Sequence, residues 1–344
     1  MTTTFSSLPI IDVFALKTNA PQQLPELSAQ LYNVFTTTGF AYLVNPPLTF
    51  SHDDVLNLAR EFFSLPQEEK MKLAKKPFRS ENRNTYRGYF PTQPLQATDN
   101  LKEGFEIGPP TPIPTKAPPP ASNINLAEPN VWPKRQFKSR QRLEQLYQEL
   151  QTLSSQVLSL LALSLHEPAD FFDPYLTHSL STLRLLHYPV TESPSPLDSN
   201  PGFSPSSSSP KLSCTPHTDS GILTFLHQDQ TGGLEVRDAS GQWVPAPYIP
   251  GSIVVNIGDL MAKVSGGRFV ATMHRVRKSA GTDFRDKDPS NLGRISVPFF
   301  FEPGEDCLVK SVDGDGDGDG DGDGVVYGEH VRAKMKTWVE FPGL

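Results

Sequence analysis

The spacing of apolar residues along the chain changes near residue 180. Before it, apolar residues recur three and four positions apart within 24–39, 51–65 and 139–165, which predicts three amphipathic helices. The last segment carries one continuous apolar stripe, as expected for a helix that covers a sheet rather than for a cofactor site. Between the first two helices, the β-branched and aromatic run at 40–44 predicts a strand.

After residue 180 the apolar residues form short runs typical of strands. These runs, separated by Gly, Pro, Ser and Asp, are "TLRLLHYPV", "GILTFLHQD", "GGLEVRD", "SIVVNIGD", "RFVATMHRV" and "RISVPFFFEP". Several short strands at this spacing indicate a sandwich, barrel or jelly roll. Helices followed by strands predict an α+β chain in which helices flank one β core.

Two low-complexity segments interrupt the strands. The Ser/Pro-rich run at 191–211 is predicted to be disordered. The Asp-Gly repeat at 313–324 is not an EF-hand loop, because no frame places a carboxylate at the twelfth position. Its six aspartates account for nearly all of the formal net charge of −7, so the charge predicts neither a nucleic-acid nor a membrane partner.

Cysteine content and hydropathy indicate the compartment. The chain has only two cysteines, Cys214 and Cys307, which is no disulfide framework and fits a reducing environment. Its first residues lack a secretory signal, and no uncharged apolar run is long enough to span a membrane. We therefore expect a cytoplasmic protein.

Two histidines and an aspartate suggest a metal site. His217 and Asp219 stand two apart at the start of an apolar run, so their side chains would share one face of a strand as a hydrogen-bonded pair, an acid/base pair or two metal ligands. His274 stands 57 residues later, in another strand. Two histidines and one carboxylate in this arrangement are the facial triad of non-haem Fe(II) oxygenases, which leaves coordination positions open.

A second group of polar residues suits a carboxylate ligand. Arg294 and Ser296 are again two apart on one predicted strand. A guanidinium fork beside a hydroxyl is suited to bind a carboxylate. Tyr188 adds a hydroxyl from another predicted strand.

With these motifs the chain resembles the isopenicillin N synthase-like family of 2-oxoglutarate/Fe(II)-dependent dioxygenases. The likeness runs through "LPIIDV", "TTTGFAYLVN", "EFFSLPQEEK", "RGYFP", "LRLLHYP", "PHTDSGILTFLHQD", "MHRV" and "RISVPFFFEP". It implies a double-stranded β-helix (jelly-roll) core with Fe(II) on His217, Asp219 and His274. It also implies that 2-oxoglutarate, used together with O2, is held by Arg294, Ser296 and Tyr188.

The resemblance also implies an organisation and an activity. Residues 1–135 are expected to form an N-terminal helical, substrate-side region, and 136–344 the β-helix core with its long helix, together one compact unit. The expected activity is oxidation of a small-molecule C–H bond by hydroxylation, desaturation or ring closure, as in secondary metabolism. The alternatives are a same-fold Fe(II) oxidase that does not use 2-oxoglutarate and a non-catalytic small-molecule-binding module.

Substrate selectivity is expected from the first half of the chain and the pocket rim. The candidate substrate residues are Arg87, Tyr86, Phe105, Ile222, Leu223, Phe299 and Phe301. The chain departs from the family at two points. The connection "KSAGTDFRDKDPSNLG" before Arg294 is longer than usual, and Leu186 stands where plant relatives often have Asn, so their substrates do not transfer to this chain.

Overall fold

The computed structural model describes most of the chain. The described residues are 3–18, 20–92, 102–113, 124–134, 137–189, 212–277, 293–313, 324–336, 338 and 341. The Ser/Pro-rich run lies outside these residues, and so does the Asp-Gly repeat apart from its first and last residues. Within the described ranges, no helix has the length and apolar character needed to cross a membrane.

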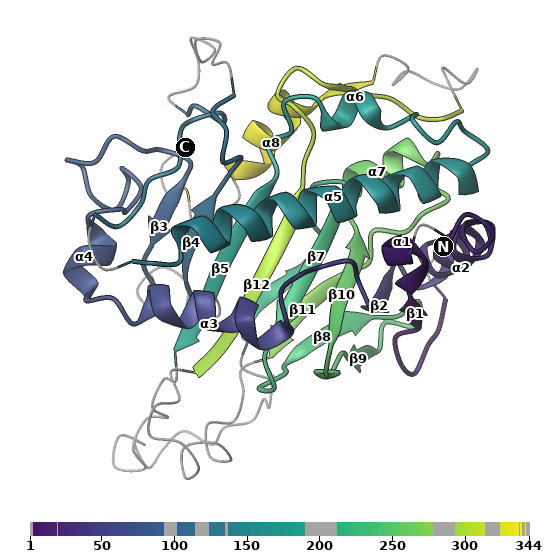
Figure 1. The fold of residues 1–344 in the computed structure, drawn as a ribbon, viewed down its shortest axis with the longest axis horizontal. Helices are drawn as coiled ribbons and strands as arrows, with labels where there is room; N and C mark the ends of the chain where they lie inside the picture. Colours follow the sequence, from purple (N-terminus) through teal and green to yellow (C-terminus); the bar gives the residue numbers. More distant parts are fainter. Residues whose placement is uncertain are drawn as a thin grey trace, which may run out of the picture.

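A large sheet of eight strands forms the centre of the fold (Figure 1). In spatial order its strands are β1 (Ile10–Asp12), β2 (Phe40–Val44), β10 (Ser252–Ile257), β7 (Leu223–Gln228), β12 (Gly293–Phe301), β5 (Thr182–Pro189), β4 (Glu103–Ile107) and β3 (Gly88–Phe90). All neighbours are antiparallel except β1 and β2. Strands from before and after residue 135 share this sheet, and the predicted boundary at that residue remains a prediction.

A smaller sheet faces the large one. Its strands are β6 (Leu212–His217), β11 (His274–Arg277), β8 (Leu234–Arg237) and β9 (Trp243–Pro245), and β13 (Leu308–Val309) pairs separately with β14 (Val325–Val326). Apolar side chains from both sheets pack together in what we call the inner core: Phe40, Tyr42, Leu186, Tyr188, Cys214, Leu234, Val236, Val254 and Val276. Two facing sheets around one core confirm the predicted jelly roll.

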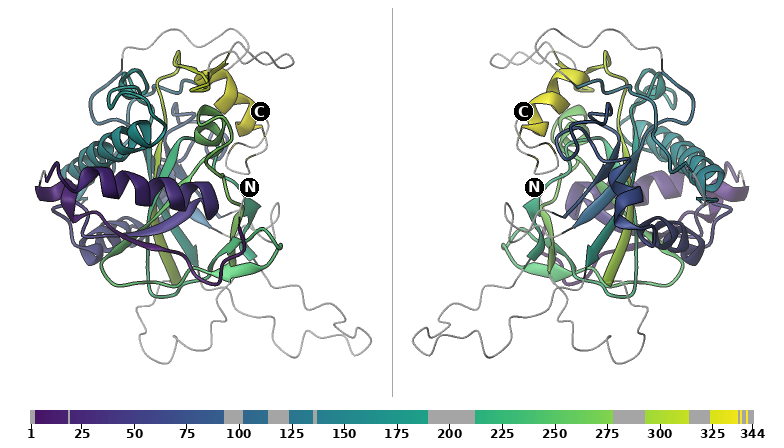
Figure 2. Two further views of the ribbon diagram at one scale, coloured as in Figure 1. Left: turned by 90° about the vertical axis from the view of Figure 1, so that its right-hand side faces the viewer. Right: turned by 90° about the vertical axis from the view of Figure 1, so that its left-hand side faces the viewer.

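Helices cover the outer face of the large sheet (Figure 2). The helices of the described residues are α1 (Phe14–Thr18), α2 (Leu24–Thr37), α3 (His52–Phe63), α4 (Gln67–Met71), α5 (Arg140–Ser164), α6 (Asp173–Leu176), α7 (Asp259–Val264) and α8 (Tyr327–Met335), and α2, α3 and α5 pack on this face. α2, α3 and α5 are the three predicted helices, and Ser51 caps α3 through a capping box with Asp54. Their apolar faces and the outer face of the large sheet form the helix-side core, which includes Leu31, Phe35, Phe62, Leu146, Leu150, Phe225, Val297 and Phe299.

The alternation of side chains along β12 positions the site. Val297, Phe299 and Phe301 belong to the helix-side core, and Phe299 packs edge-on against Tyr147 of α5. Because successive side chains of a strand point to opposite faces, the even-numbered residues face the inner side. β12 therefore presents Arg294 and Ser296 to the space between the two sheets.

Candidate active site

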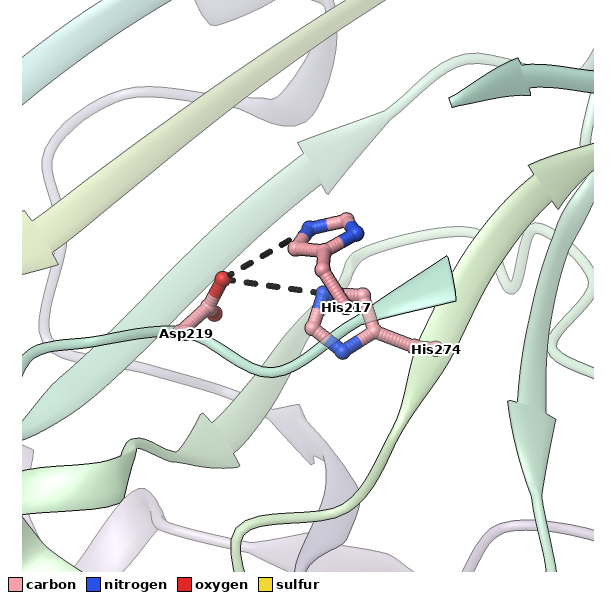
Figure 3. A group of neighbouring side chains, drawn as sticks. All are labelled: His217, Asp219 and His274. Carbon is pink, nitrogen blue, oxygen red and sulfur yellow. Dashed lines mark ion pairs between the residues drawn. The ribbon is translucent and has the colours of Figure 1, made fainter. Parts of the chain in front are cut away.

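The two histidines and the aspartate of the sequence analysis lie together at one end of the small sheet (Figure 3). His217 ends β6 and His274 begins β11, and the two are direct cross-strand partners. Asp219 lies two residues beyond the end of β6. Its Oδ1 is 3.9 Å from Nε2 of His217 and 3.6 Å from Nε2 of His274. The three possible ligand atoms lie within 4.8 Å of one another, which suits a single metal ion.

Hydrogen bonds orient each of the three side chains. Thr224 Oγ1 and Asn256 Nδ2 donate to Oδ2 of Asp219, at 2.6 and 2.8 Å, so that Oδ1 faces the histidines. Nδ1 of His217 is 2.8 Å from the carbonyl oxygen of Thr215, and Nδ1 of His274 is 3.2 Å from that of Thr272. With Nδ1 engaged by a carbonyl, each Nε2 is left for a metal, as in most histidine metal sites. Two imidazoles and one carboxylate oriented in this way fit Fe(II).

The three groups differ in protonation when no metal is bound. Burial raises the pKa of Asp219, but the neighbouring His274 and His217 outweigh it and lower that pKa. Burial lowers the pKa of His274 to about 4, which makes its imidazole neutral at pH 7. Burial also disfavours the charged form of His217, but Cys214 and Asp219 raise the pKa of its imidazole to about 9. A metal at Nε2 of His217 therefore displaces a proton.

The hydrogen bonds to Asp219 give a first prediction. Thr224→Val and Asn256→Ala should each weaken metal binding by about 10- to 100-fold, because outer hydrogen-bond partners fix the ligand that they contact. Mn(II) titration of the purified variants measures the effect. Thr152→Val, on the exposed side of α5, is the control and should bind Mn(II) like the parent chain. Unchanged affinity in both site variants would contradict this role.

Arg294, Ser296 and Tyr188 also lie together. Arg294 and Tyr188 are cross-strand partners on β12 and β5, and the guanidinium carbon lies 4.8 Å from the centre of the tyrosine ring. Arg294 donates to Ser296 Oγ at 3.0 Å and to the carbonyl oxygen of Gly232 at 2.8 Å. The side chain is buried, and in the described part of the chain no carboxylate lies within ion-pair distance of it. A buried guanidinium of this kind fits an acidic ligand.

A cavity of about 490 Å³ opens beside the metal ligands. Its wall includes His217 and Asp219 and does not include Arg294, Ser296 or Tyr188. The remaining lining residues are Tyr86, Lys102, Glu106, Thr182, Arg184, Cys214, Thr215, Pro216, Thr218, Ser220, Gly221, Met273, Phe300, Glu302, Lys334 and Trp338. The cavity is therefore lined by both charged and aromatic side chains, and a small polar molecule would fit it.

Of the predicted substrate residues, the structure brings only Tyr86 to the cavity wall. Arg87 is buried behind that wall, where its guanidinium donates to Thr182 Oγ1 at 2.5 Å and to the carbonyl oxygen of Leu180 at 2.7 Å. The others lie in the helix-side core: Phe105, Ile222, Leu223, Phe299 and Phe301. We correct their assignment: none of the five lines the cavity, and Leu223, Phe299 and Phe301 share the helix-covered face of the large sheet.

The charged residues of the cavity wall, apart from the metal-site residues, were not predicted from the sequence to belong to the site. Glu302 follows β12 in phase with Arg294 and Ser296, and Thr182 and Arg184 share the inner face of β5 with Tyr188. Continuing the same alternation from Arg294 along "RISVPFFFE" reaches Glu302. The signal that could have identified Glu302 is that it follows an apolar run and has the same strand parity as Arg294 and Ser296.

Comparison with known proteins is consistent with this geometry. Residues 181–303 match the family model of the 2OG-Fe(II) oxygenase superfamily. Residues 8–135 match the model described as the N-terminal region of the non-haem dioxygenase in morphine synthesis. The first match contains all three metal-site residues, and it also contains Tyr188, Arg294 and Ser296.

Individual relatives match between about three quarters and nearly all of this chain. Homoarginine-6-hydroxylase 2-ODD-233 of Oryza sativa subsp. japonica is 31% identical, covering 97% of this chain and 98% of that protein. The 2-oxoglutarate-Fe(II) type oxidoreductase hxnY of Emericella nidulans is 34% identical over 74% of this chain and 68% of its own length. The crystal structure of a full-length Neurospora crassa protein in complex with alpha-KG and thymine matches with a TM-score of 0.72 and 26% identity, over 96% of this chain and 97% of that one. This chain belongs to the 2OG-Fe(II) oxygenase superfamily.

Proposed function

We propose that this oxygenase oxidises a C–H bond of a small polar molecule bound in the 490 Å³ cavity. The observation that carries the proposal is that His217 and Asp219 form part of the cavity wall while His274 completes the ligand set. A substrate in the cavity would therefore lie directly beside the metal. The resulting reaction is hydroxylation, in keeping with the name of the rice relative, a homoarginine-6-hydroxylase.

The protein's own residues supply binding and orientation. His217, Asp219 and His274 would hold Fe(II), and Arg294, Ser296 and Tyr188 would hold the distal carboxylate of 2-oxoglutarate. When bound, Fe(II) and 2-oxoglutarate together activate O2 for oxidation of a C–H bond. Three protein ligands leave positions on the metal for the cosubstrate and O2. The buried surroundings of Arg294 keep water from competing for its carboxylate partner.

Dioxygen-dependent formation of succinate from 2-oxoglutarate tests this function. Iron-loaded protein should form succinate in air, and should form none without Fe(II), without 2-oxoglutarate or under nitrogen. The assay is run alone and with L-homoarginine or thymine, because relatives are named for or crystallised with these molecules. Substrate oxidation without 2-oxoglutarate would instead indicate an oxidase, and absence of both succinate formation and 2-oxoglutarate binding would indicate a binding module.

The location and partners are part of the same proposal. Two cysteines in 344 residues support a reducing compartment such as the cytoplasm. A formal charge of −7 with no basic excess supports a small molecule, rather than nucleic acid or an anionic membrane surface, as the partner.

A further inference from the structure

β12 carries opposite charges at its two ends. Arg294 is near its beginning, and Glu302 directly follows its last residue. The two residues are eight positions apart, which corresponds to about 26 Å of extended chain. Glu302 lines the same cavity as His217 and Asp219, whereas Arg294 lies outside the cavity wall. A buried carboxylate therefore faces the substrate side of the metal centre.

The position of Glu302 is fixed by hydroxyl groups. Thr182 Oγ1 donates to Oε2 of Glu302 at 3.0 Å, and the main chain of Glu302 bonds to the hydroxyls of Ser179 and Ser181 at 2.7 and 3.1 Å. Only 5% of Glu302 is exposed. Arg87 shares Thr182 with it but directs its guanidinium to Thr182 and Leu180. This carboxylate is thus held in place before any ligand arrives.

Glu302 differs from Glu106, another carboxylate of the cavity wall, in its ionic partners. Glu106 pairs with Arg184 at 2.5 Å and with Lys75 at 2.6 Å. For Glu302, no cationic group of the described residues lies within ion-pair distance. Burial raises the pKa of Glu302, and the more distant charges of Arg87 and Arg184 only partly oppose this shift. A buried carboxylate that has no direct ion pair, its nearest guanidinium being that of Arg87 on the far side of the Thr182 hydroxyl, is costly, and binding of a cation would offset part of that cost.

An aromatic side chain of the cavity wall adds to the attraction for a cation. Trp338 lines the cavity together with Glu302, whereas the rings of Tyr86 and Phe300 in the same wall already contact the guanidinium groups of Arg87 and Arg184, 4.4 and 5.1 Å from the ring centres. The faces of aromatic rings attract ammonium and guanidinium groups. A carboxylate accompanied by the indole ring of Trp338 is a chemical environment suited to an organic cation.

We propose that Glu302 is a specificity-determining residue that binds a cationic group, an ammonium or a guanidinium, of the substrate. The inference rests on the proposed function, because it takes the cavity to be the substrate site. Thr182 is the positioning residue that orients the carboxylate. A neutral molecule of the same shape would leave Glu302 buried without a counter-charge, and would therefore bind more weakly.

Two pairs of probes of nearly equal shape test the proposal. L-homoarginine is compared with L-homocitrulline, and butylguanidine, which has no amine, with N-butylurea; in each pair a guanidinium is replaced by a neutral urea. Binding to Mn(II)-loaded protein with saturating 2-oxoglutarate is measured by anaerobic calorimetry, which requires no turnover. At least one cationic probe should bind about tenfold or more tightly than its neutral partner, since an unpaired buried charge is left in the neutral complex.

Variants assign the preference to Glu302. Glu302→Gln should remove the preference for the cationic probe, and Glu302→Asp, which keeps the charge, should retain part of it. Glu305→Gln, three residues away and paired with Arg332, is the matched control and should bind both probes like the parent chain. Mn(II) content and melting temperature report folding, and the comparison of paired probes on the unmodified protein needs no variant.

The outcomes separate this inference from the proposed function. Lack of a cationic preference in both pairs would overturn the role of Glu302, as would equal affinity of Glu302→Gln and the parent chain for the preferred probe. If the parent chain meanwhile forms succinate from 2-oxoglutarate, the proposed function stands without this specificity. If it neither binds 2-oxoglutarate nor forms succinate, the proposed function fails.

Discussion

Replacing Asp219 with alanine is expected to abolish both Fe(II) binding and turnover while leaving the chain folded. The Oδ1 atom of Asp219 faces both imidazoles. Without it, the metal site would consist of two histidine side chains and would lack its anionic ligand. The inner core and the helix-side core are apolar and do not depend on the ion. His217→Ala and His274→Ala should have the same effect. Iron content, succinate formation and melting temperature are measured on each variant.

Exposed residues of the same types provide the controls. Asp170→Ala and His166→Ala alter positions at the surface, outside the metal cluster and the cavity wall, and should keep the parent iron content. Full activity in either site histidine variant would contradict the assignment of the triad. Loss of the cooperative thermal transition in all three site variants would show that these residues support the fold rather than the metal.

The metal-site residues were predictable because two of them are close in sequence and only the third depends on a long-range strand pairing. His217 and Asp219 are fixed relative to each other by two residues of backbone. The position of His274 beside them depends on the pairing of β11 with β6, which the sequence indicates only through a second strand and the resemblance to a family. The structure places the three together as predicted.

The substrate residues show where the sequence was insufficient. Phe299 and Phe301 were expected at the pocket rim, but they have the parity opposite to that of Arg294 and Ser296 and belong to the helix-side core, where Phe299 contacts Tyr147 of α5. Phe105 also points to the helix-covered face of the sheet, where its ring stacks on that of Phe62 of α3. In a strand covered on both faces, apolar composition does not distinguish the two sides, and only the register with respect to a polar residue does.

The partners of Asp219 and Glu302 illustrate a second limit. Asn256 reaches Asp219 from β10, 37 residues away, and Thr182 reaches Glu302 across 120 residues. Such contacts arise from sheet order, in which β10 neighbours β7 and β5 neighbours β12. Nothing in the local pattern around Asn256 or Thr182 marks them as partners of a buried carboxylate. They become visible only once the strands are paired.

The second large effect is expected at Arg294, which tests the 2-oxoglutarate site. The distal carboxylate of 2-oxoglutarate would meet a guanidinium that is 5% exposed and held by Ser296 and Gly232. Removing one partner of such a buried charge pair costs about 2–5 kcal/mol, largely because the other charge is left unpaired. At about 1.4 kcal/mol per factor of ten, Arg294→Gln should weaken 2-oxoglutarate binding roughly 30-fold or more.

Arg294→Lys should lose less than Arg294→Gln, because it keeps the charge and gives up only the planar fork. Both variants should bind Fe(II) like the parent chain, since Arg294 has no contact with the three metal-site residues in the structure. Arg140→Gln, at an exposed position of α5, is the control. The measurement is a 2-oxoglutarate titration of succinate formation, together with calorimetric binding to the Mn(II)-loaded protein. If Arg294→Gln titrates like the parent chain, the carboxylate is held elsewhere. If the parent chain oxidises its substrate without 2-oxoglutarate, the protein is an Fe(II) oxidase and Arg294 does not bind 2-oxoglutarate as a cosubstrate.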